Sequence, residues 1–124
     1  MVKEKTHVLG KHLLVNCSRV DRDVCLDDKK FLETIADAAR RAGSTVVSQV
    51  RYHLGHNSPP GFTCVVLLDE SHISAHTYAD KNVIALDIFT CGKTDPYNVL
   101  DIVKETIDLG DLDVRMVDRF LVCE

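Results

Sequence analysis

The sequence has no apolar run near the length of about 20 residues that crosses a bilayer, and its first residues lack the apolar stretch of a secretion signal. Lysine and arginine are not clustered, and the formal net charge is −4, so the basic patch that nucleic-acid binding requires is missing. These absences argue against a membrane protein and against a nucleic-acid partner. We expect a cytoplasmic protein that acts on a small molecule.

Paired cysteine motifs are also absent. The cysteines are odd in number and form no CxxC pair, which argues against a disulfide framework and a classical zinc site; they are Cys17, Cys25, Cys64, Cys91 and Cys123. His72 and His76 have a spacing that would suit a metal on a helix, but the β-branched Ile73 and Thr77 favour an extended or turning segment, and no third ligand is evident. We therefore predict reduced thiols and no metal site.

The length and the hydrophobic content of 45% suit one globular domain over residues 1–124. Two segments have the apolar spacing of amphipathic helices, one between Asp27 and Gly43 and one that begins at Asp95-Pro96. Five segments have strand character: 8–15, 45–54, 63–68, 82–90 and 112–122. The order β-α-β-β-β-α-β predicts an α+β two-layer sandwich, a mainly antiparallel sheet with two helices on one face.

The segment 82–90 would place apolar side chains on both faces of that sheet. Two helices cover only one face, so the apolar side chains of the other face need a partner. A second copy of the same chain is the simplest one, because most soluble oligomers are symmetric homo-oligomers. We predict a homodimer.

The most reactive side chains gather in Asp69-Glu70-Ser71-His72-Ile73-Ser74-Ala75-His76-Thr77 and in Phe89-Thr90-Cys91-Gly92, on either side of an apolar run. These motifs, together with Gly10-Lys11-His12-Leu13, resemble those of the prokaryotic S-adenosylmethionine decarboxylases. The resemblance covers nearly the whole chain, and its specificity lies in the central third. It implies a self-processing, pyruvoyl-dependent decarboxylase of polyamine biosynthesis that acts as a dimer.

The resemblance makes Ser71 the residue that attacks the carbonyl of Glu70 and splits the chain into a β chain, residues 1–70, and an α chain, residues 71–124. Ser71 then becomes a covalent pyruvoyl group at the new amino terminus. A ketone made from the backbone can take the electrons that a leaving carboxylate releases, so no external cofactor is required.

A serine hydroxyl is ordinarily a weak nucleophile, so the attack needs a nearby base and donors for the oxyanion; His72, His76 and Thr63 are the candidates in reach along the sequence. The resemblance makes His76 the processing histidine and Thr63 its assistant, and an imidazole both takes and returns a proton near neutral pH. It makes Cys91 the residue that returns a proton to the substrate after CO2 has left. A thiol suits that step because it is mostly protonated at neutral pH.

For substrate binding, the resemblance points to Asp80, which stands where the family usually has a glutamate that binds ribose hydroxyls. Leu54 stands where the family has an aromatic residue that stacks on adenine. Tyr52, Phe62 or Tyr78 could supply an aromatic face instead, because any such face can stack on a base.

Two alternatives stay open. Related pyruvoyl enzymes decarboxylate arginine or ornithine, whose cationic tails would prefer acidic partners such as Asp80, Asp69 or Asp87. The chain could also be a catalytically dead homologue that activates a partner subunit, although its complete set of reactive residues argues against this. S-adenosylmethionine is the favoured substrate.

Overall fold

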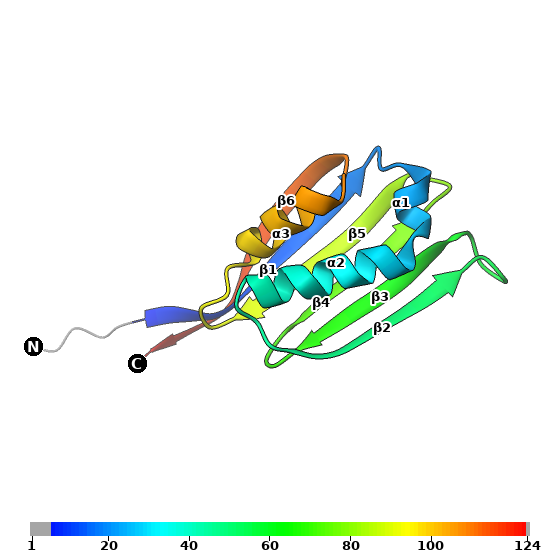
Figure 1. Ribbon diagram of the computed structural model, residues 1–124. Coiled ribbons are helices and arrows are strands. Elements are labelled where there is room, and N and C mark those ends of the chain that lie inside the picture. Colours follow the sequence, from blue (N-terminus) through cyan, green and yellow to red (C-terminus); the bar gives the residue numbers. More distant parts are fainter. Residues whose placement is uncertain (1–5, 124) are drawn as a thin grey trace, which may run out of the picture.

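A computed structural model describes residues 6–123, which form one six-stranded sheet (Figure 1). The strands lie in the order β2-β3-β4-β5-β1-β6, and all neighbouring strands are antiparallel. Their bounds are β1 Thr6–Ser18, β2 Val46–Leu54, β3 Gly61–Leu68, β4 His72–Tyr78, β5 Val83–Cys91 and β6 Asp111–Cys123. The amino-terminal strand therefore lies inside the sheet, between β5 and β6.

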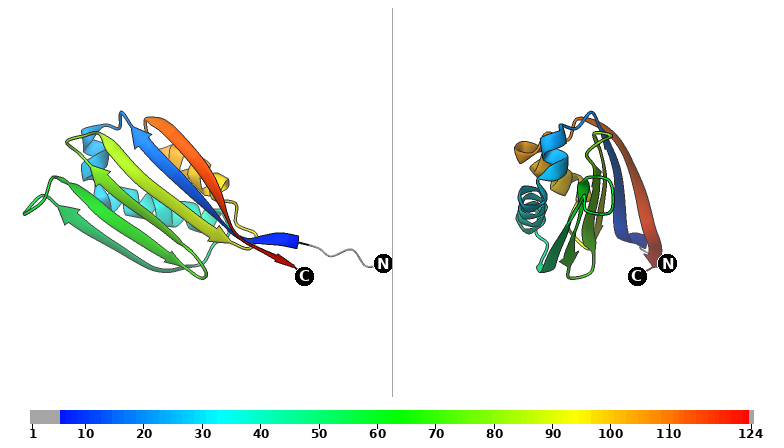
Figure 2. Two further views of the ribbon diagram at one scale, coloured as in Figure 1. Left: turned by 180° about the vertical axis from the view of Figure 1, so that it is seen from behind. Right: turned by 90° about the vertical axis from the view of Figure 1, so that its right-hand side faces the viewer.

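Three helices cover one face of this sheet: α1 Arg22–Leu26, α2 Asp28–Arg41 and α3 Pro96–Thr106. The right-hand view of Figure 2 shows the two layers, with all helices on the same side of the strands. The core fills the space between them. Phe31 and Ile35 of α2 and Val99 of α3 are fully buried there, as is Phe62 of β3. The predicted α+β two-layer class is confirmed.

Local sequence explains where the two long helices begin. The carboxylate of Asp27 accepts a hydrogen bond from the backbone N–H of Lys30, and that of Asp95 accepts one from the backbone N–H of Tyr97. Side chains that accept from the first free N–H groups stabilise a helix start, and Pro96 suits the first helical position because its missing N–H has no helical partner to lose. Both predicted helices are present.

The predicted element order was incomplete in two places. The polar segment before Asp27 forms the short helix α1, which buries Cys25 against the sheet. The segment after Ser71 is a sixth strand, β4, whose side chains alternate between buried and partly exposed positions. One face of this strand is largely polar, and the other carries Ile73 as its single large apolar residue, so the hydrophobic signal was weak and periodicity missed it.

The sheet face opposite the helices is uncovered in the single chain, and we call it the open face. Large apolar side chains are exposed on it, among them Val50, Tyr52, Leu67 and Val117. Several exposed apolar side chains on one uncovered face are a mark of an interaction surface. No helix within residues 6–123 is long and apolar enough to span a membrane.

Candidate active site

The Glu70-Ser71 peptide bond lies in the tight connection between β3 and β4. The backbone N–H of Leu68 donates to the carbonyl oxygen of Ser71 at 2.9 Å, and that of Asp69 donates to the carbonyl oxygen of Thr45 at 3.1 Å. Glu70 is exposed and Ser71 is half-buried. The hairpin therefore holds this bond at the end of the sheet, where other groups can approach it.

Cys91, the last residue of β5, touches that bond directly. Its thiol donates a hydrogen bond to the carbonyl oxygen of Glu70, with a distance of 3.3 Å between sulfur and oxygen. Burial raises the pKa of the Cys91 thiol, and the nearby carboxylate of Glu70 raises it further. The thiol is thus protonated at neutral pH. Ser71 and Cys91 also line the same shallow pocket, of about 200 Å³.

Gly10 of β1 makes room for this arrangement. A Cβ atom at Gly10 would lie 2.7 Å from Cε1 of Phe89 and 3.2 Å from the sulfur of Cys91. The first distance is shorter than real Cβ contacts, so any side chain at residue 10 would displace the ring of Phe89. The family motif Gly10-Lys11-His12-Leu13 therefore has a packing reason at its first position.

Thr63 and His76 form a pair of their own. They are cross-strand partners on β3 and β4, and the Thr63 hydroxyl lies 2.9 Å from Nδ1 of His76. His76 is four positions beyond His72 on an extended strand, and at a rise of about 3.3 Å per residue this places it about 13 Å further from the turn. Thr63 and His76 of one chain therefore lie well away from its own Ser71, and the processing roles expected for them stay predictions.

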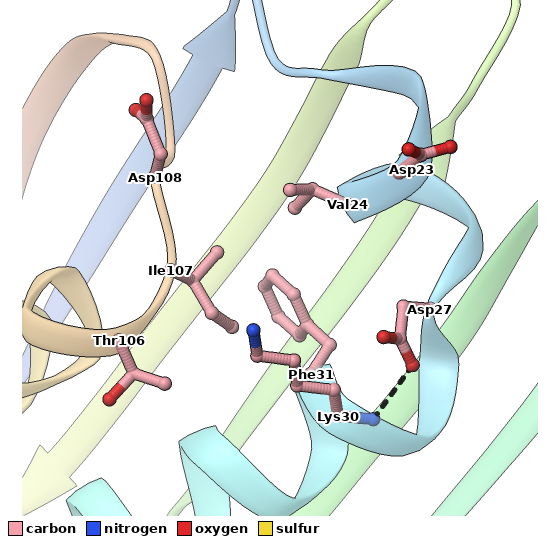
Figure 3. Close-up of a pocket in the computed structure, with 8 residues that line it drawn as sticks. All are labelled: Asp23, Val24, Asp27, Lys30, Phe31, Thr106, Ile107 and Asp108. Atoms are coloured by element: carbon pink, nitrogen blue, oxygen red, sulfur yellow. Dashed lines mark hydrogen bonds between the residues drawn. The ribbon is translucent and has the colours of Figure 1, made fainter.

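Another pocket lies in the helix layer, away from these residues. Figure 3 shows its apolar floor, formed by Val24, Phe31 and Ile107, and acidic residues around it. It contains none of the residues of the two reactive motifs. Within residues 6–123, no cluster of three or more His, Cys, Asp or Glu side chains is arranged to hold a metal ion.

Comparisons with known proteins agree with this geometry. The family model described as S-adenosylmethionine decarboxylase matches residues 11–120. An S-adenosylmethionine decarboxylase proenzyme from Syntrophomonas wolfei is 34% identical over 116 residues, which are 92% of this chain and 89% of the relative. The S-adenosylmethionine decarboxylase proenzyme 2 from Bacillus cereus is 36% identical over 112 residues, 89% of this chain and 88% of the relative. The chain belongs to the S-adenosylmethionine decarboxylase family.

A solved structure supports the same assignment. The crystal structure of the adenosylmethionine decarboxylase from Aquifex aeolicus matches with a TM-score of 0.77 and 30% identity, over 93% of both chains. The six-stranded sheet with its helices on one face is thus the arrangement of an S-adenosylmethionine decarboxylase.

The residues expected to bind substrate lie in different environments. Asp80 accepts a 2.6 Å hydrogen bond from Nη1 of Arg22, so its carboxylate already has a cationic partner. Leu54 is half-buried at the end of β2, and Tyr78 is about half exposed at the end of β4. Phe62 has no exposed surface and packs against Phe31, with 5.3 Å between ring centroids. Its ring belongs to the core and offers no face to a ligand. The prediction that Phe62 could stack on a base is therefore wrong.

One residue near the Glu70-Ser71 turn of this S-adenosylmethionine decarboxylase family member was missed from the sequence. His12 belongs to the motif Gly10-Lys11-His12-Leu13, but the resemblance implied no function for it. It is the cross-strand partner of Phe89, which lies two positions before Cys91. Only the register between β1 and β5 brings it there, and a register between strands so distant in the sequence is not visible from a periodic pattern.

Proposed function

We propose that the chain is a self-processing, pyruvoyl-dependent decarboxylase that acts on S-adenosylmethionine. The observation that carries the proposal is the contact between the Cys91 thiol and the carbonyl oxygen of Glu70. It joins the two motifs at the one carbonyl that Ser71 has to attack. The names of the relatives, which are S-adenosylmethionine decarboxylase proenzymes, support the same reading.

The proposed processing uses groups of the chain alone. The Ser71 hydroxyl oxygen attacks the carbonyl carbon of Glu70, and the bond from that carbon to the Ser71 nitrogen breaks, so that an ester replaces the amide. The Cys91 thiol, which already donates to the carbonyl oxygen, stabilises the negative charge that develops there. Loss of the α-proton of residue 71 then releases the carboxylate of Glu70. Water finally replaces the nitrogen of residue 71, which leaves as ammonia.

The hairpin suits a cut at this position. The backbone pairs between β3 and β4 run from Thr63↔His76 to Leu67↔His72, and all of them lie outside the Glu70-Ser71 bond. A cut there would open the turn and leave the ladder intact, so residues 1–70 and 71–124 would stay in one sheet. The new terminus at residue 71 would lie beside Cys91. A pyruvoyl group there would supply the electron acceptor for decarboxylation.

We further propose that the active enzyme is a homodimer in which a second copy supplies the Thr63–His76 pair. The pair is too far along β4 to reach Ser71 of its own chain, and Thr63 and His76 lie on the open face. Exposed apolar side chains on the same face support its burial against another sheet. A symmetric dimer would bring each pair to the partner's turn.

A mixing experiment tests the shared site. Ser71→Ala and His76→Ala chains should each stay uncleaved when they are produced alone. In a mixed dimer, the His76→Ala chain keeps Ser71 and receives His76 from the other subunit, so about a quarter of all chains should be cleaved after random pairing. Intact-mass measurement distinguishes the two chains. If the mixture stays uncleaved although mixed dimers form, each site is built from one chain.

The substrate proposal rests on Asp80 as well. Arginine or ornithine would bring a cationic tail, but Arg22 already pairs with this carboxylate, so much of its charge is offset. A paired carboxylate still has free lone pairs that accept from ribose hydroxyls. This favours S-adenosylmethionine over a basic amino acid. Parallel assays on S-adenosylmethionine, arginine and ornithine test it, and a preference for either basic amino acid would reverse the assignment.

Self-cleavage tests the central proposal and the dead-homologue alternative together. Purified protein should give two masses, for residues 1–70 and for residues 71–124 with the new terminal group, and Ser71→Ala should give one. A wild-type chain that stays whole after prolonged incubation would contradict the proposal and favour an activating partner subunit. We retain a cytoplasmic location as a prediction.

A further inference from the structure

A row of rings crosses the open face next to the reactive turn. His12 of β1 and His72 of β4 are both cross-strand partners of Phe89 on β5. Each imidazole centroid lies 5.6 Å from that of Phe89, and the two imidazoles are 6.2 Å apart. The guanidinium carbon of Arg119 on β6 lies 5.5 Å from the same centroid. Three nitrogen-bearing side chains thus surround one aromatic ring.

One atom in this row lacks a partner. Nε2 of His12 is buried and makes no hydrogen bond to any group within the described residues. The nearest acid, Asp87, has its Oδ2 atom 4.0 Å away, which is beyond hydrogen-bond distance. Buried polar atoms are nearly always hydrogen-bonded, so an exception needs an explanation. A group that binds on the open face would provide one.

The row is close to the reacting residue. His72 directly follows Ser71 in the chain, and Phe89 precedes Cys91 by two positions, which is about 7 Å along a strand. A substrate held at residue 71 would therefore have its first atoms beside the thiol and the row. Its single anionic group is the α-carboxylate, and the row offers nitrogen donors.

We propose that His12 binds the α-carboxylate of the substrate through Nε2, beside Arg119 and over the edge of Phe89. The inference rests on the proposed decarboxylase function and adds to it the residue that orients the bond to be broken. The bond between the α-carbon and the carboxylate must stand at a large angle to the plane of the electron acceptor. A fixed contact to the carboxylate maintains this angle better than a mobile contact does.

The electrostatic surroundings of His12 suit a residue that orients the α-carboxylate without binding it tightly. Burial lowers the pKa of His12; Asp87 of β5 opposes this, while His72 of β4 and Arg119 of β6 lower the pKa further. At neutral pH the ring is therefore uncharged and, with the proton on Nε2, donates one hydrogen bond. The carboxylate of Asp87, 4.0 Å from Nε2, offsets part of the positive charge of Arg119 at this place, so the α-carboxylate is held less tightly than by Arg119 alone and the loss of CO2 is opposed less.

The test compares ligands with and without the carboxylate. His12→Leu and His12→Gln are assayed with S-adenosylmethionine, and the decarboxylated product serves as a competitive ligand that lacks the carboxylate. Loss of one hydrogen bond to a charged group should raise KM for the substrate about tenfold to a hundredfold in His12→Leu, while the inhibition constant of the product stays within about twofold. His12→Gln, which keeps a donor, should recover part of the loss. His53→Gln, on the helix-covered face, is the matched control and should match the wild type.

Readouts besides turnover separate the possible failures. Intact mass should show complete self-cleavage in both His12 variants, and reduction with cyanoborohydride should trap the product amine on residue 71 equally in variant and wild type. Equal weakening of substrate and product, or of neither, would overturn the carboxylate assignment. A His12→Leu protein that changes only its oligomeric state would show that the partner subunit satisfies Nε2, and the assignment would fall. An uncleaved wild-type chain would overturn the proposed function itself.

Discussion

The two faces of the sheet carry different kinds of residues. On the helix-covered face, alternate positions of the inner strands are buried and apolar, such as Phe62 and Cys64 of β3. On the open face, the same strands carry more exposed side chains, polar ones such as Thr63 and His76 beside apolar ones such as Leu67. Because strand side chains alternate, one sheet can serve packing and chemistry separately. Substitutions on the two faces should therefore fail in different ways.

The largest effect should come from Cys91→Ala. Removing the positioned acid should lower turnover by about 10²- to 10⁴-fold, because α-carbon protonation loses its donor, while self-cleavage continues or slows. Turnover per cleaved chain is the measurement, with cleavage counted by intact mass. Cys17→Val, in the core, serves as the control and should keep its turnover. Processed Cys91→Ala protein with wild-type turnover would return Cys91 to a structural role.

The covered face should show the next largest effect, on folding stability. Phe62→Ala removes a fully buried ring and should lower the free energy of unfolding by about 3–5 kcal/mol. Tyr52→Ala removes a ring that is 68% exposed on the open face and should change it by about 0.5 kcal/mol or less in the single chain. Urea denaturation measures both. Equal losses would contradict the division between the faces, and a Tyr52 effect that grows with protein concentration would report the proposed dimer.

The residues expected to bind substrate should give a smaller effect that depends on the substrate. If Asp80 pairs with the tail of arginine or ornithine, Asp80→Asn removes a charge-assisted contact of about 1.5–3 kcal/mol and lowers kcat/KM by about one to two decades. If it binds ribose hydroxyls, the amide oxygen still accepts, and activity on S-adenosylmethionine falls less. Steady-state kinetics on all three substrates decide between these cases.

Leu54→Phe complements Asp80→Asn. A restored aromatic face at the end of β2 should favour an adenine-bearing substrate by about 1–3 kcal/mol and crowd the shorter ones.

The control for the change of charge in Asp80→Asn is Arg41→Gln. Arg41 pairs with Glu105 in the helix layer. Unchanged kcat/KM ratios in both variants would mean that Asp80 and Leu54 do not set specificity.

The sequence predicted the features that depend on residues close together along the chain. It did not predict those that depend on how the strands pair. The caps at Asp27 and Asp95 and the apolar spacing of the two long helices are local, and both helices are present. The contact between Cys91 and Glu70 and the row around Phe89 follow from strand register, which joins segments about 20 residues apart or more. The burial of Phe62 was missed because the predicted strand began at Thr63, whereas β3 begins at Gly61 and includes Phe62.

A further effect should appear in the pH dependence of stability, again on the covered face. Burial raises the pKa of Cys17 and of Cys64 from 9.0 to about 12. The folded chain therefore keeps these protons over a range in which the unfolded chain loses them. The stability that the thiols contribute is fully present below about pH 9 and falls as the pH rises from there toward 12.

Cys64→Val tests this because it keeps an apolar side chain of similar size and removes the titration. The free energy of unfolding, measured by urea denaturation from pH 8 to 11, should decline less steeply with pH in Cys64→Val than in wild type. Cys91→Val is the comparison from the other side of the sheet: its thiol is only partly buried, so its removal should flatten the slope less. Parallel curves for wild type and Cys64→Val would mean that the buried thiol does not ionise on unfolding in this range, and the difference between the faces would then rest on packing alone.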